Sequence, residues 1–213
     1  MLLLSSSATA LDVPVDDLSN WTVLSFSNIK PNEVSVDNGA LRIAVAGSAS
    51  PLVYRFDKPV RVTGVTVTAS WTGSLTIPPG VTQGDNNADD FVLKFGIVEA
   101  GERRLNWLQR SIAADWIKQL FKLAPKGSGV ERIHFLSTTQ QKELLGSSRV
   151  HPLSDLLYET RVLYLEGPGD FVLQQEFTDP AETLGLWLSV DGDDTGSNFE
   201  LRIKSIALQL ESP

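Results

Sequence analysis

Apolar and polar residues alternate along most of the chain. In the stretches 40–46, 91–98 and 184–190, every second residue is apolar. Because side chains alternate between the two faces of a β-strand, each stretch predicts a strand with one buried face. Turn sequences separate such stretches, at residues 37–39, 78–80, 167–170 and 191–194. Many short strands divided by turns predict a mainly β fold, an antiparallel β-sandwich of jelly-roll type.

Two longer apolar patterns change phase once. Within 60–71 the apolar positions change parity at Gly64, and within 199–210 they change near Ser205. A shift of one residue in an alternating pattern predicts a β-bulge within a continuous strand. Bulges bend strands, as a curved sandwich requires.

The middle of the chain follows a different period. Apolar residues recur there at steps of three and four, namely Leu105, Leu108, Ile112, Trp116, Leu120 and Leu123. This spacing predicts an amphipathic helix, or two helices with Asp115 capping the second. We therefore expect one β-sandwich domain over 11–213 that carries a partly helical insertion around residues 102–157.

Composition and charge narrow the function classes. The chain has 213 residues, of which 42% are hydrophobic and 21% charged, which is typical of a soluble globular domain. Its net charge of −8 argues against nucleic-acid binding, which requires a basic face. The absence of cysteine excludes disulfides and Cys-based zinc sites. No apolar run approaches the roughly 20 residues of a membrane span, so none is expected.

The first ten residues have features of a targeting segment. A run of three leucines is followed by small residues and by Ala8-Thr9-Ala10, which has the form of an A-x-A cleavage site. Residues 1–10 are therefore expected to be a residual signal or a disordered start. Together with the absence of cysteine, this favours a periplasmic or extracellular location.

An acidic loop at 191–198 is the first candidate site. Asp191, Asp193, Thr195 and Gly196 match the opening positions of an EF-hand loop. The twelfth position is Arg202 where an EF-hand has Glu, and a strand pattern follows where an EF-hand has a helix, so an EF-hand is excluded.

A second acidic loop, at 84–91, supplies further carboxylates. If the two loops meet, Asp89 and Asp90 join Asp191 and Asp193 as ligands of a Ca²⁺ ion. The alternative is a pair of solvated turns, because neighbouring carboxylates in water repel by only about 1 kcal/mol per pair. Burial would decide between the two, since a desolvated carboxylate requires a cation or hydrogen-bond donors. We expect Asp191 and Asp193 to point inward and Asp194 to face solvent.

The second candidate site is on the strand before the acidic loop. Its apolar set is Leu184, Leu186, Leu188 and Val190. Trp187, Ser189 and Asp191 lie on the opposite, more polar face, where they form a candidate ligand-binding set. An indole on that face can stack on a sugar ring. The alternative is that the helical insertion covers Trp187.

Catalytic motifs are absent from the sequence. Only two histidines occur, His134 and His151, and no nucleophile elbow, zinc-protease motif or phosphate-binding loop is present. A carboxylate pair for glycoside hydrolysis remains open, since the fold sets its separation.

Six of the 18 basic residues gather in the expected helical segment: Arg103, Arg104, Arg110, Lys118, Lys122 and Lys126. They favour either a surface for an acidic partner or anionic lipid, or a docked helix whose basic residues lie in solvent or pair with acidic groups.

Five stretches carry a family resemblance: 20–26, 48–59, 88–98, 148–159 and 184–203. Together they resemble a family of uncharacterised secreted bacterial proteins with a galactose-binding or lectin-like β-sandwich. The resemblance implies this fold and a secreted location. Saccharide binding follows only by analogy with the fold.

These observations lead to one main functional hypothesis. The chain is expected to be a secreted, non-catalytic β-sandwich that binds a carbohydrate or another cell-envelope ligand, with structural Ca²⁺ as an open question. Two alternatives remain. The first is a carbohydrate-active hydrolase or lyase that uses Asp and Glu residues. The second is an envelope protein that binds a partner through its basic helix.

Overall fold

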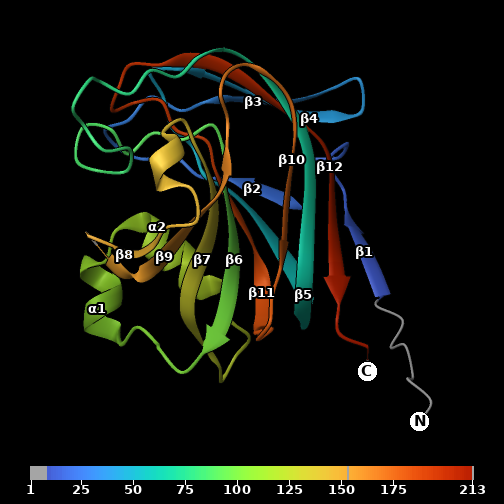
Figure 1. Cartoon of the computed structure of the whole chain (residues 1–213). Helices are drawn as coiled ribbons and strands as arrows, with labels where there is room; N and C mark the ends of the chain where they lie inside the picture. Colours follow the sequence, from blue (N-terminus) through green and yellow to red (C-terminus); the bar gives the residue numbers. More distant parts are fainter. Residues whose placement is uncertain (1–8, 153, 213) are drawn as a thin grey trace.

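Two β-sheets, joined by one long strand, make up most of the computed structural model, which describes residues 9–152 and 154–212 (Figure 1). The joining strand is β5 (Leu52–Ser74), which has 23 residues. Its first part pairs with β2 and β11, and its second part pairs with β10 and β12. The predicted antiparallel β-sandwich is therefore confirmed, and β5 connects its two layers.

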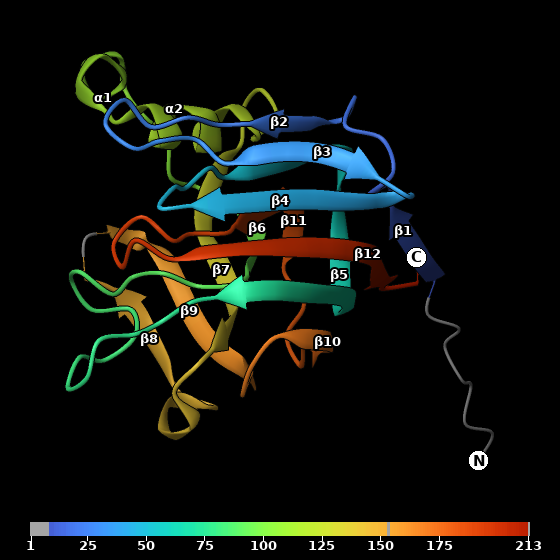
Figure 2. The same ribbon diagram turned by 90° about the horizontal axis from the view of Figure 1, so that it is seen from above.

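Sheet A has the strand order β3-β4-β12-β5-β10, with β1 beside the last part of β12. Figure 2 shows β3, β4 and β12 side by side. The bounds of its strands other than β5 are Thr9–Val13 (β1), Glu33–Asp37 (β3), Ala40–Ala46 (β4), Gly169–Glu176 (β10) and Asn198–Leu210 (β12). All its pairs are antiparallel.

Sheet B has the strand order β2-β5-β11-β6-β7-β9-β8. The bounds of its strands other than β5 are Trp21–Val23 (β2), Lys94–Gly101 (β6), Gly129–Thr139 (β7), Ser148–His151 (β8), Ser154–Tyr164 (β9) and Glu182–Ser189 (β11). One pair, β7 with β9, is parallel, and the others are antiparallel.

Both predicted bulges are present, and both strands continue across them. Gln209 pairs with Gly64 and Leu210 pairs with Val62, so Thr63 is the extra residue in β5. The register of β12 shifts in the same way between Ile203 and Ser205. The bulge in β5 lies where the strand leaves sheet B for sheet A. A bulge bends a strand, and this bend allows β5 to change layers.

The main core lies between the two sheets and is built from the inward-facing residues of the alternating patterns. It includes Leu41, Ile43, Val67, Phe95, Leu186, Leu188, Leu201 and Ile203, all buried. Leu184 differs from its predicted set. The register of β11 shifts between Thr183 and Gly185, and Leu184 packs instead in a second apolar cluster.

This second cluster covers the outer face of sheet B. Helix α2 (Asp115–Lys122) contributes Leu120, and the sheet contributes Ile133, Phe135 and Trp187. In Figure 1, α1 (Trp107–Ile112) and α2 lie beside β7, β8 and β9, on the side away from β12 and β1. Part of the molecule therefore has a third, helical layer.

The helices of the expected insertion are two short α-helices and one 3₁₀ turn. Residues 102–157 are partly helical, but α1 and α2 end by Lys122, and a single 3₁₀ turn follows at Lys142–Leu144. Residues 129–139 form β7, which pairs with β6 and β9 inside sheet B. Residues 129–139 therefore supply a strand within this partly helical segment, with one face against the core and one toward α2.

The apolar period of the helical segment is interrupted. The side chain of Asn106 caps α1 through the backbone N–H of Gln109, and a break at Ala113 and Ala114 precedes α2. Of the predicted apolar stripe, the residues in and just after α2 pack against the outer face of sheet B. Leu108 in α1 is 54% exposed and Trp107 is 80% exposed.

Thr9 and Ala10 begin β1, whereas residues 1–8 of the expected signal segment lie outside the described residues.

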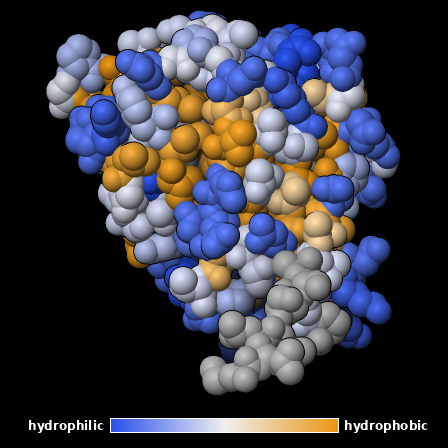
Figure 3. Space-filling model, turned by 45° about the vertical axis from the view of Figure 1, so that its right-hand side comes forward, coloured by the Kyte–Doolittle hydropathy of each residue, from blue (hydrophilic) through white to orange (hydrophobic). Residues whose placement is uncertain are grey.

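On the face seen in Figure 3, apolar and polar side chains are interspersed, and apolar ones gather in its middle. In the part of the chain that the structure describes, no helix has the length and apolar character needed to cross a membrane.

Candidate functional site

A cavity of about 480 Å³ opens on the outer face of sheet B, between α2 and the two acidic loops. Its two walls differ in chemistry. The apolar wall includes Phe26, Trp116, Ile117, Phe135, Leu157 and Trp187. The charged wall includes Asp89, Lys94, Glu159, Asp191, Asp193 and Asp194. The cavity therefore combines aromatic surface with several charged groups.

The pairing of the strands fixes how these groups line up. Trp187 on β11 pairs with Gly96 on β6, which pairs with Phe135 on β7, which pairs with Glu159 on β9. A side chain at Gly96 would come within 2.8 Å of the Trp187 carbonyl oxygen and 2.6 Å of Ile133. Glycine at this position therefore allows Trp187 and Phe135 to lie on either side of it without a clash.

The ammonium group of Lys94 is the centre of the charged wall. Lys94 is only 7% exposed, and its Nζ lies 3.2 Å from Asp89, 3.6 Å from Asp191 and 3.8 Å from Glu159. Burial alone would lower the pKa of Lys94, but the three carboxylates together raise it above its ordinary value. Lys94 is therefore a permanently charged, built-in cation among the buried acids.

The two acidic loops meet, as the metal hypothesis required. The backbone N–H of Asp89 donates to the Asp194 carboxylate (3.0 Å), and that of Asp194 donates to Asp90 (3.2 Å). Asp90 is fully buried and also accepts two bonds of 2.6 Å from the backbone and hydroxyl of Thr195. Asp90 thus joins the loops to each other through hydrogen bonds and does not line the cavity.

The carboxylates of the charged wall have different proton affinities. Burial raises the pKa of Asp191 to about 7, and Lys94 only partly offsets this effect. Burial also raises the pKa of Asp193. For Asp89, the effect of burial is outweighed by Lys94 and His151, which together hold its pKa below the ordinary range. The site therefore places a carboxyl that is half-protonated near neutral pH beside one that stays ionised.

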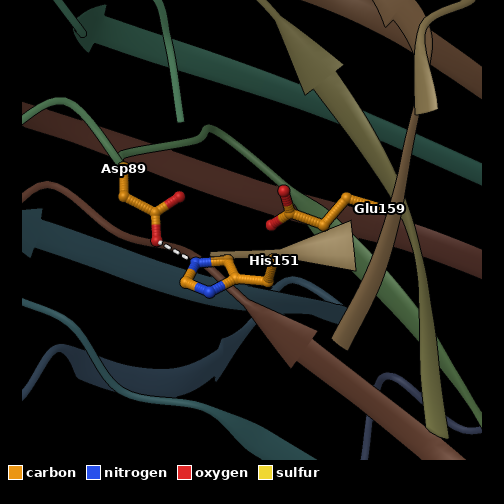
Figure 4. A group of neighbouring side chains, drawn as sticks. All are labelled: Asp89, His151 and Glu159. Carbon is orange, nitrogen blue, oxygen red and sulfur yellow. Dashed lines mark hydrogen bonds and ion pairs between the residues drawn. The ribbon is translucent and has the colours of Figure 1, made fainter. Parts of the chain in front are cut away.

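Asp89, His151 and Glu159 form the one group of metal-ligating side chains found among the described residues (Figure 4). One ligand atom from each lies within 4.8 Å of the others, and His151 Nε2 is 3.1 Å from Asp89. These donors suit a divalent cation in type.

The charges around this group work against a further cation. Glu159 accepts from Arg149 at 2.8 Å, lies 3.4 Å from Arg161 and is also near Lys94. Three basic side chains therefore already neutralise the carboxylates. The predicted Ca²⁺ ion, with Asp191, Asp193, Asp89 and Asp90 as ligands, stays a prediction.

The predicted ligand-binding residues are brought together. Trp187, Ser189 and Asp191 all line the cavity. The indole of Trp187 is 3% exposed and meets Trp116 of α2 edge to face, with the ring centroids 6.4 Å apart. The insertion therefore covers most of Trp187, which was the alternative given above. Trp116 is the more accessible of the two rings.

Sequence reasoning missed three residues of the site: Lys94, His151 and Glu159. For Lys94 a signal was present, because it is the single charged residue in the apolar run 91–98. For His151 and Glu159 no local signal indicates the site, since Asp89 and Lys94, which they contact there, come from a distant segment of the chain.

The basic residues of the helical segment mostly pair with nearby groups. Arg103 lies 2.9 Å from Asp155 and 3.7 Å from Glu131, and Lys118 lies 3.1 Å from Asp115. Arg104 donates to the carbonyl of Gly127. These contacts agree with a docked helix whose basic side chains lie at the surface.

No protein-family model and no curated protein sequence matches the chain. Solved structures with a similar arrangement include the xylan-binding module CBM15 (10% identity, TM-score 0.40, covering 96% of this chain and 97% of that chain). Peanut lectin gives 11% identity, a TM-score of 0.39 and coverages of 96% and 97%. The active domain of tailspike protein 4 from bacteriophage CBA120 gives 9% identity and a TM-score of 0.40, and the chain spans only 20% of its length. The resemblance to a secreted bacterial family stays a prediction.

Replacing Lys94 by Met should destabilise the fold strongly. The substitution leaves Asp89, Asp191 and Glu159 without their shared cation, and breaking a buried ion pair in this way costs about 3–5 kcal/mol. Urea unfolding at neutral pH measures the effect. Lys204→Met is the matched control, because its pair with Asp170 is largely solvent-exposed and should be worth less than about 1 kcal/mol. Equal effects of the two substitutions would contradict the role assigned to Lys94.

Asp191→Asn should change how stability depends on pH. The folded-state pKa of Asp191, about 7, is above its ordinary value of 3.8, so Asp191 favours folding below the ordinary value. That contribution is lost as the pH rises through 7. The asparagine variant lacks this loss, so its stability relative to the native chain should increase from pH 5 to pH 8. Thermal unfolding across this range measures the difference, and a constant difference would show that Asp191 does not titrate there.

Proposed function

We propose that this chain is a secreted, non-catalytic binding protein that takes a carbohydrate or a similar envelope ligand in the cavity beside α2. One observation carries the proposal: aromatic rings, several carboxylates and a lysine line a single cavity of about 480 Å³. A sugar ring has an apolar face and a rim of hydroxyl groups, which match these two walls.

The individual contacts follow from the positions of the groups. Trp116 and Phe26, both half-buried, offer apolar surface to the ring face. Among the polar lining groups, Asp89 and Asp193 accept hydrogen bonds from hydroxyl groups, and Ser189 and Lys94 donate. Asp191 adds a further carboxyl group to these polar lining residues. The charged groups are held in place by one another, so little ordering is required when a ligand binds.

Calcium is a separate part of this proposal. Asp89, Asp191 and Asp193 all line the cavity, and Asp193 is only partly buried. Such a site would take Ca²⁺ through carboxylate and carbonyl oxygens in an irregular geometry. Lys94 opposes it by supplying positive charge at the same place.

A second candidate function is hydrolysis or eliminative cleavage of a polysaccharide. The observation in its favour is the contrast between Asp191, whose pKa of about 7 suits a general acid, and Asp89, which stays ionised. Both carboxylates lie within 4 Å of Lys94 Nζ and face the cavity.

Trp116→Ala should weaken saccharide binding by roughly 10-fold or more, since burying a large side chain against a ligand is worth about 1–3 kcal/mol. Isothermal calorimetry with a panel of xylo-, cello- and galacto-oligosaccharides measures binding. Trp107→Ala is the matched control, because Trp107 lies on α1, 80% exposed and outside this cavity.

Equal affinities of the two variants would contradict a site beside α2. Release of shortened products from any member of the panel, lost in Asp191→Asn, would favour the hydrolase or lyase instead.

Millimolar Ca²⁺ should raise the melting temperature in a dose-dependent way if the cation binds the folded chain, because a ligand of the folded state stabilises it by mass action. Asp193→Asn should lose most of this response. Differential scanning fluorimetry with EDTA and with added Ca²⁺ gives the measurement. Identical melting curves would contradict Ca²⁺ binding, and Lys94 would then be the cation that neutralises these carboxylates.

A further inference from the structure

A second cavity, of about 340 Å³, lies on the inner face of sheet B, beside strand β10 at the edge of sheet A. Its apolar floor includes Val62, Ile97 and Leu136. Polar and aromatic groups surround this floor, among them Glu99, Arg132, His134, Tyr158, Thr160 and Phe177. The first cavity lies on the opposite, outer face of the same sheet, so the two are separate.

The polar groups of this second cavity form a hydrogen-bonded chain with one gap. Ser148 and Thr160 share a hydrogen bond of 3.0 Å, and Thr160 is 3.1 Å from His134 Nε2. At the other end, Arg132 donates to Glu99 Oε2 at 2.9 Å. Between the two ends, His134 Nδ1 and Glu99 Oε1 face each other at 3.8 Å, which is too long for a hydrogen bond.

The donors along this chain can all point the same way. Ser148 donates to Thr160, Thr160 donates to His134 Nε2, and the proton of the imidazole is then on Nδ1, facing Glu99. This arrangement leaves one donor, His134 Nδ1, and one acceptor, Glu99 Oε1, without a hydrogen-bond partner in the part of the chain that the structure describes. A hydroxyl group is complementary to this pair, because it accepts one hydrogen bond and donates another.

We propose that this cavity is a second ligand site, which takes a hydroxyl group of a neutral saccharide or polyol between Glu99 and His134. The hydroxyl accepts from His134 Nδ1 and donates to Glu99 Oε1, completing the chain from Ser148 to Arg132. The same position suits a water molecule, which the ligand hydroxyl replaces with its hydrogen bonds retained.

The aromatic groups around the gap supply the apolar contact for such a ligand. The ring centroid of His134 is 5.0 Å from that of Tyr158 and 6.0 Å from that of Phe177. The guanidinium of Arg132 lies over Tyr158 at 5.0 Å, so one face of that ring is already covered. Phe177, half-buried in the segment after β10, therefore offers the ring surface on which a sugar can pack.

The charges of this cavity favour a neutral ligand. Glu99 is already paired with Arg132, so a cation finds no unpaired buried charge there. An anion would meet Glu99, Glu176 and Asp179 together. Burial and the neighbouring Arg132 lower the pKa of His134 to about 4, so the imidazole is uncharged at neutral pH.

The two histidines of the chain allow each cavity to be observed separately. His134 lines the second cavity and His151 lines the first. Proton NMR at pH 7 resolves one imidazole Cε1–H signal from each. Titration with xylobiose, cellobiose, galactose and glycerol should shift the His134 signal in a saturable way for at least one of these probes, whether or not the His151 signal moves. A His134 signal that stays unmoved at millimolar concentrations of every probe would overturn the proposal.

A substitution separates the hydrogen bond from packing. His134→Phe keeps an aromatic ring against Tyr158 and Phe177 but removes Nδ1, so binding of the active probe should weaken at least 10-fold. Calorimetry measures that affinity. Ile29→Ala is the control, because Ile29 lines only the first cavity and should leave this affinity unchanged.

Thr160→Val is a second variant, and it keeps the histidine. It removes the hydroxyl group that donates to His134 Nε2, so the imidazole proton is no longer held on Nδ1 and the same binding should weaken. Unchanged affinity in both His134→Phe and Thr160→Val would refute the site. This result is independent of the Trp116 experiment, since the two cavities share no lining residue.

Discussion

The passage of β5 from one sheet to the other is the constraint on which the sandwich depends. Because Leu52 to Arg61 pair in sheet B and the residues from Val62 onward pair in sheet A, one strand fixes the position of both layers. Its partner in sheet B, β11, in turn pairs with β6. The start of β6 therefore lies beside the end of β11. The acidic loop that precedes β6 meets the acidic loop that follows β11. The site is a consequence of this pairing.

At that meeting point, buried charge controls the chemistry. Carboxylates from three different segments converge, and desolvation would make such a cluster unfavourable without a counter-charge. Lys94 supplies it from within the sheet, and Arg149 and Arg161 neutralise Glu159 from the other side. The acidic loop at 191–198 is thus neither a free solvated turn nor an isolated charge cluster. It is half of an internal ion-pair network that also borders a cavity.

Sheet B has a cavity on each face, and the alternation of its strands explains why. Phe135 and Glu159 face outward, toward α2 and Lys94, whereas their neighbours His134 and Tyr158 face inward, toward β10. Adjacent residues on the same two strands therefore serve different environments. The outer cavity is rich in charge, and the inner one has a single gap in a hydrogen-bonded chain.

Alternation along the sequence was enough to predict several of the strands, the bulges near Gly64 and Ser205, and the outward position of Trp187, because a period of two is a local property. It also brought Asp191 and Asp89 forward as partners. The assembled fold was needed to show that residues 129–139 enter sheet B, that Trp116 covers Trp187, and that Lys94 is the cation among the acids. These outcomes depend on pairing between segments far apart in the chain, such as Lys94 with Glu159 and Asp191. Local periodicity carries no information about such partners, since the register of the strands and the burial of each charge are set only when the sheets assemble.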